Sequence, residues 1–67
     1  MEKSLGEALP EEQARVREVL GVYKDLGLAG RFSAILIEVE LEEADRAVMS
    51  GDLTAMLKAY TALKGCQ

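Results

Sequence analysis

Three carboxylates stand at helical spacing in the middle of the chain: Glu38, Glu42 and Asp45. Positions i, i+4 and i+7 lie on one face of a helix, and hard cations such as Mg²⁺ or Ca²⁺ prefer carboxylate oxygens as ligands. Helix bundles that hold metals usually take carboxylates from several helices together with Glu-x-x-His pairs. The chain contains no histidine. We therefore favour a solvated acidic face, and we keep a carboxylate-based divalent-metal or small-ligand site as the alternative.

The single cysteine, Cys66, lies one residue before the last position. Cysteine nucleophiles are commonly activated by a neighbouring histidine, which this chain lacks. One thiol cannot form an internal disulfide, and a zinc site would lack its usual ligands. The segment Gly27–Gly30 has no lysine-serine pair of the kind that a phosphate-binding loop requires. The sequence therefore predicts a protein that is not an enzyme, with no catalytic residue, no metal and no cofactor.

The charge balance is acidic, with eight basic and twelve acidic residues and a net charge of −4. Binding to a nucleic-acid backbone requires a basic patch that displaces counterions, and the basic residues here are interleaved with acidic ones. No apolar run approaches the roughly 20 residues that cross a bilayer. The first residues also lack the apolar segment of a signal peptide. We expect a cytoplasmic protein that binds neither nucleic acid nor a membrane.

Glycine, proline and capping residues divide the chain into helical segments. Pro10 suits the first turn of a helix, where its missing N–H is not needed. Gly27 and Gly51 follow the last apolar residues of two periodic segments, where a left-handed residue often ends a helix. Ser33 and Asp52 are of the residue types that cap helix N-termini. The sequence predicts a small all-α three-helix domain with helices at about residues 10–26, 33–49 and 52–64, a single domain over residues 10–67 and a flexible tail over residues 1–9.

The segment AILIEVELEE, residues 34–43, carries two periods at once. Apolar and acidic residues alternate from Ile37 to Glu42, as in a half-buried strand. Apolar residues also recur at steps of three and four, and this helical period continues as far as Val48. No other segment alternates over a similar length, so a strand here could pair only with a second molecule. We interpret the segment as helical.

The apolar residues of this middle helix occupy two sides of a wheel drawn at roughly 100° per residue. The first side comprises Ala34, Ile37, Leu41, Ala44 and Val48. The second side lies in the N-terminal half and comprises Phe32, Ile35, Leu36 and Val39. Either the other two helices cover one side each, or the second side faces a partner.

Residues 44–63, ADRAVMSGDLTAMLKAYTAL, resemble the helical hairpin of tetratricopeptide-repeat proteins. In that family a helix of small residues ends in a turn, and a second helix carries alanine and tyrosine. Because the chain holds no second copy of the unit and a solenoid needs about three, the resemblance implies the hairpin geometry alone. The segment from Gly30 to the closing LKGC is also similar to short uncharacterised helical proteins of bacteria and their prophages, and that resemblance implies no activity.

The functional hypothesis follows from the size of the chain. A chain of 67 residues buries only about 60% of the surface that its unfolded form exposes, so a partner surface would add stability. We expect a non-enzymatic protein–protein interaction or self-assembly module, such as a small regulator or assembly factor. It would form a homo-oligomer, with a dimer favoured, or dock on another protein. The expected interface comprises Phe32, Ile35, Leu36 and Val39, joined by Met56 and Tyr60.

Overall fold

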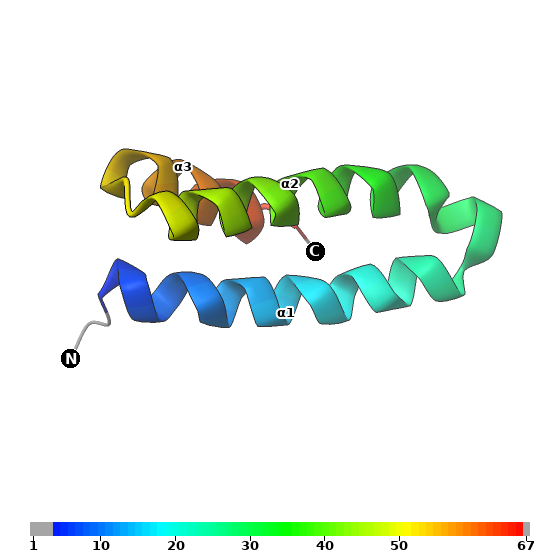
Figure 1. Cartoon of the computed structure of the whole chain (residues 1–67). Coiled ribbons are helices and arrows are strands. Elements are labelled where there is room, and N and C mark those ends of the chain that lie inside the picture. Colours follow the sequence, from blue (N-terminus) through cyan, green and yellow to red (C-terminus); the bar gives the residue numbers. More distant parts are fainter. Residues whose placement is uncertain (1–3, 67) are drawn as a thin grey trace.

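The computed structural model describes residues 4–66, and within this range the chain forms three α-helices and no strand (Figure 1). Helix α1 spans Leu5–Asp25, the short 3-10 turn η1 spans Gly27–Gly30, α2 spans Arg31–Ser50 and α3 spans Leu53–Lys64. Helices α1 and α2 run antiparallel, and α3 folds back along the C-terminal half of α2. The predicted all-α fold is confirmed, and the segment with two periods is helical.

Helix α1 begins earlier than the sequence predicted. It starts at Leu5 and runs through Pro10, although a proline ring removes one backbone hydrogen bond from a helix interior. The extra turn is stabilised because Leu9 is fully buried, Leu5 packs against the core, and the Ser4 carbonyl accepts two backbone N–H groups of the first turn. The prediction of a flexible tail is therefore wrong from Leu5 onward, while Met1–Lys3 lie outside the described residues.

Two left-handed glycines set the connections between the helices. Gly27 and Gly51 have φ of 65° and 71°, as expected for residues that end a helix. Asp52 caps α3 as predicted, because its side chain accepts hydrogen bonds from the backbone N–H groups of Thr54 and Ala55, at 2.9 and 3.3 Å. Ser33 is not the N-cap of α2, however, because η1 leads directly into a helix whose N-cap is Gly30.

The core draws side chains from all three helices: Leu9, Val16, Ala34, Ile37, Leu41, Ala44, Ala47, Met56, Ala59 and Leu63. The first apolar side of the middle helix is therefore buried as predicted, except at its end. Val48 is 40% exposed, and its neighbour Ala47 is buried in its place. The prediction for Val48 is wrong because α3 turns back on the side of α2 that carries Ala47, where Ala55 and Ala59 lie beside it. Small side chains thus form the meeting surface of α2 and α3.

Gly30 and Gly21 make opposite predictions for stability. A Cβ added at Gly30 would overlap the backbone carbonyl of Tyr23, whereas a Cβ at Gly21 would meet no atom of the described residues within 4 Å. We expect Gly30→Ala to lower the free energy of unfolding by about 1–3 kcal/mol. Gly21→Ala should raise it by up to about 1 kcal/mol, because alanine is the better helix former. Urea unfolding followed by circular dichroism measures both, and a Gly30→Ala variant as stable as the wild type would contradict the close approach.

Candidate functional site: the exposed face of helix α2

The second apolar side of the middle helix points away from the core. We call Phe32, Ile35, Leu36 and Val39 the exposed face of α2; their exposed fractions are 75%, 51%, 52% and 48%. Helices α1 and α3 both pack against the other side of α2, which carries Ile37 and Ala44. The alternative that the other two helices cover one side each is therefore wrong within this chain. Four large apolar side chains in consecutive turns remain in contact with solvent.

The two α3 residues that the sequence assigned to the same surface lie elsewhere. Met56 is 8% exposed and belongs to the core, so it is not part of the exposed face of α2. Its place in the sequence gave no sign of this, because Met56 and Leu57 are both apolar and α3 buries Met56 while Leu57 faces solvent. Tyr60 is half-buried against the core, with the ammonium group of Lys64 5.2 Å from its ring centre.

Sequence reasoning missed further apolar residues at the α1–α2 end of the molecule. Leu26 and Leu28 are 56% and 85% exposed, and they lie on either side of the left-handed Gly27. Leu28 lies in the short turn η1, which projects beyond the helices (Figure 1). Its side chain is therefore away from the core. The sequence carried a signal for this, because Leu28 is a large apolar residue in a short connection bounded by Gly27 and Gly30. This end of the molecule is thus apolar on more than one surface.

A shallow groove lies beside Leu36, where α3 ends. It has a volume of about 430 Å³ and is lined by Tyr23, Ser33, Leu36, Ile37, Glu40, Ala62, Gly65 and Cys66. The Cys66 thiol donates to the Ala62 carbonyl at 3.7 Å. Burial raises the pKa of this thiol, and the negative charge of Glu40 acts in the same direction. A protonated thiol is a weak nucleophile, so burial lowers the reactivity of Cys66.

Two of the three carboxylates at helical spacing, Glu38 and Asp45, bind side chains of α1. Glu38 forms an ion pair with Lys24 at 3.6 Å, and Asp45 accepts from Gln13 at 2.7 Å and pairs with Arg17 at 3.3 Å. All three contacts join α1 to α2. Among residues 4–66, no group of three or more acidic, histidine or cysteine side chains is arranged to hold a metal ion. The geometry gives no support to the metal alternative.

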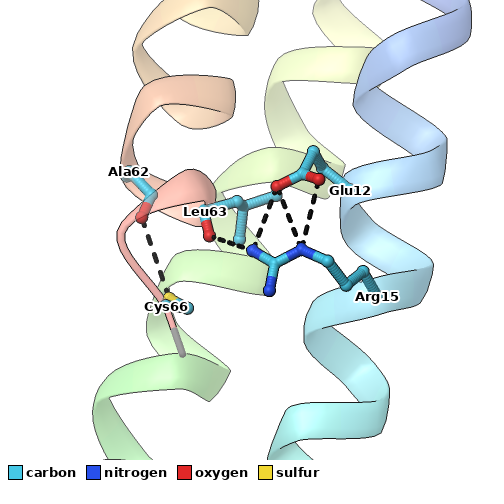
Figure 2. A network of polar contacts seen from close by, with 5 residues as sticks. All are labelled: Glu12, Arg15, Ala62, Leu63 and Cys66. Carbon is cyan, nitrogen blue, oxygen red and sulfur yellow. Dashed lines mark hydrogen bonds and ion pairs between the residues drawn. The ribbon is translucent and has the colours of Figure 1, made fainter.

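A second polar network fixes the end of α3 (Figure 2). The Arg15 guanidinium donates to the Leu63 carbonyl at 2.9 Å and to both carboxylate oxygens of Glu12, one of them at 3.1 Å through its Nη2 atom. Arginine is a permanent cation in proteins, and the hydrogen bond to Glu12 raises the pKa of Arg15 further. One of the last carbonyls of α3 thus gains a charged donor from α1. The network joins the end of α3 to α1.

No family model, no curated protein and no solved structure matches the chain. No helix in the described part of the chain has the length and apolar character needed to cross a membrane. The candidate site therefore rests on its own geometry, which is the exposure of four large apolar side chains on α2.

Cys66 gives a pH-dependent prediction. Because its pKa is raised in the folded protein, its thiolate fraction near pH 8 should be smaller than in the unfolded chain. The rate of iodoacetamide labelling against pH should have a higher midpoint for the native protein than for the protein in urea. The comparison of midpoints separates thiol ionisation from access to the reagent. Equal midpoints, or a lower one in the native protein, would contradict the burial of the thiol.

The acidic residues give a prediction about divalent cations. A cation that binds only the folded state at ten times its Kd would stabilise the fold by about 1.4 kcal/mol. For a domain of this size, that corresponds to a rise in Tm of several degrees. Because Glu38 and Asp45 are bound to side chains of α1, we expect millimolar MgCl₂ or CaCl₂ to leave Tm unchanged at constant ionic strength. A cation-specific rise in Tm would restore the metal alternative.

Proposed function

We propose that the chain is a non-enzymatic helical module that self-associates through the exposed face of α2. The observation that carries the proposal is the exposure of Phe32, Ile35, Leu36 and Val39, which together present roughly 400 Å² of apolar side chain. Soluble monomers rarely expose larger contiguous apolar patches, and patches of this size are often functional. A surface of this kind is stabilised when a second apolar surface removes it from water.

The shape of the molecule shows that its helices are incompletely covered. The radius of gyration is 12.3 Å, and a compact chain of this length would have a value of about 11 Å. The accessible surface is 4759 Å², against an average of about 4,200 Å² for a folded monomer of this mass. The excess arises because α1 and α2 extend beyond the end of α3 (Figure 1). The fold therefore leaves a pair of helices that a further element could cover.

A second copy of the chain is the occupant that fits this surface best. A standard interface removes about 800 Å² from each partner, and the exposed face of α2 supplies roughly half of that as apolar area. The residues around it would supply the remainder as a polar rim. An isologous dimer places the same face on both sides of the interface, so one unpartnered surface is covered by another. Such a module would suit the role of a small regulator or assembly factor in the cytoplasm.

Ile35→Glu tests the proposal. Ile35 is half exposed, so the variant should keep the helical circular dichroism of the wild type, while a charge in the middle of the interface should prevent association. Light scattering coupled to size exclusion at tens of micromolar protein should give a dimer mass for the wild type and a monomer mass for the variant.

Leu57→Glu is the matched control. Leu57 is 57% exposed on α3, away from the exposed face of α2, so the same change in polarity should leave the dimer mass unaltered. A monomer mass for the wild type would overturn self-association. A dimer that resists Ile35→Glu and is lost in Leu57→Glu would place the interface on α3.

A further inference from the structure

Opposite charges stand at the two ends of the exposed face of α2. Arg31 lies at its N-terminal end, and Glu42 lies just beyond Val39 at its other end. The two residues are about three helical turns apart, so they project from the same edge of the apolar row. Both side chains are exposed, and neither forms an ion pair or side-chain hydrogen bond with any residue in the range 4–66. The row is therefore flanked by an unused cation and an unused anion.

The order of these charges distinguishes the two ways of pairing α2 with a copy of itself. A twofold axis perpendicular to the helices makes them antiparallel and keeps each edge of one row beside the same edge of the other. Arg31 of each copy then faces the partner's Glu42. A twofold axis along the helices makes them parallel and places the two Glu42 residues on opposite edges of the interface. Glu43, which continues the apolar row four residues after Val39, would then lie beside the partner's Glu43. Like charges at close range repel, so the parallel pairing is disfavoured.

The N-terminus of α2 favours the same arrangement. No side chain among the described residues caps this helix end, and its first turn contains no acidic residue. A helix N-terminus carries a partial positive charge that an anion stabilises. In the antiparallel pairing, the partner's Glu42 approaches the turn that carries Arg31. The dipole and the guanidinium therefore attract the same carboxylate.

We propose that two copies pack α2 against α2 in antiparallel orientation about a twofold axis beside Leu36, with Arg31 of each copy paired with the partner's Glu42. The proposal rests on the proposed function, because it assumes that the exposed face of α2 is the self-association surface. Ile35 and Leu36 then lie at the centre of the interface, and Phe32 of one copy lies near the partner's Val39. The apolar residues supply the affinity, and the two symmetric ion pairs fix the orientation.

Charge reversal tests the pairing by sedimentation equilibrium at low salt. Arg31→Glu and Glu42→Arg should each raise the dimer Kd roughly tenfold, because each replaces two attractions across the twofold axis by two repulsions. The double variant Arg31→Glu/Glu42→Arg exchanges the charges and should return the Kd to near the wild-type value. Arg31→Glu is not expected to raise the Kd through loss of folding, because an acidic residue in the first turn of α2 stabilises that helix.

Lys64→Glu is the control for net charge, because it makes the same change as Arg31→Glu on the solvent side of α3. It should leave the Kd within about twofold of the wild type at matched ionic strength. If the two variants raise the Kd equally and the double variant shows no recovery, the antiparallel pairing is overturned while self-association stands. If the wild type sediments as a monomer throughout, the proposed function fails, and the pairing fails with it.

Discussion

The structure depends on the fact that α1 and α3 pack against one half of the circumference of α2. The helix buries Ile37, Leu41 and Ala44 on that half, and it is apolar on the other half as well, over its N-terminal turns. A third helix of 12 residues spans about 18 Å, while α2 with 20 residues spans about 30 Å. Leu36 lies beside the end of α3, whereas Phe32, Ile35 and Val39 are about half exposed or more. A further surface is needed to remove them from water.

Polar contacts specify how α1 lies on α2, and they give Glu38 and Asp45 a structural role. Gln13 is buried, yet its amide finds the Asp45 carboxylate, and Lys24 pairs with Glu38 further along the same two helices. These partly exposed contacts contribute little energy individually, but they specify which edges of the helices meet. Two of the three carboxylates that suggested a metal site are thus accounted for by the fold. Glu42 is the member of that row without such a contact, which leaves its carboxylate available for the proposed pairing with Arg31.

The sequence was sufficient for the helices and insufficient for their exact packing. Gly51 and Asp52 ended one helix and began the next as expected, because a left-handed glycine and a capping aspartate act locally. The start of α1 was missed because Leu9 is stabilised by residues far along the chain, which no local signal reports. Met56 was misassigned for the same reason, since the direction from which α1 approaches α3 decides which apolar residue is buried. The second apolar side of α2 was visible in the sequence, but the sequence left open whether another helix covers it, because that depends on how α1 and α3 pack on α2.

The most direct test of the central claim is the dependence of Tm on protein concentration. If the exposed face of α2 is covered by a second copy, association is linked to folding, and dilution must lower the apparent stability. We expect the midpoint of thermal unfolding, followed by circular dichroism over about a hundredfold range of concentration around the dimer Kd, to rise steadily with concentration. A midpoint that stays constant over that range would contradict the claim that folding is completed by a second copy.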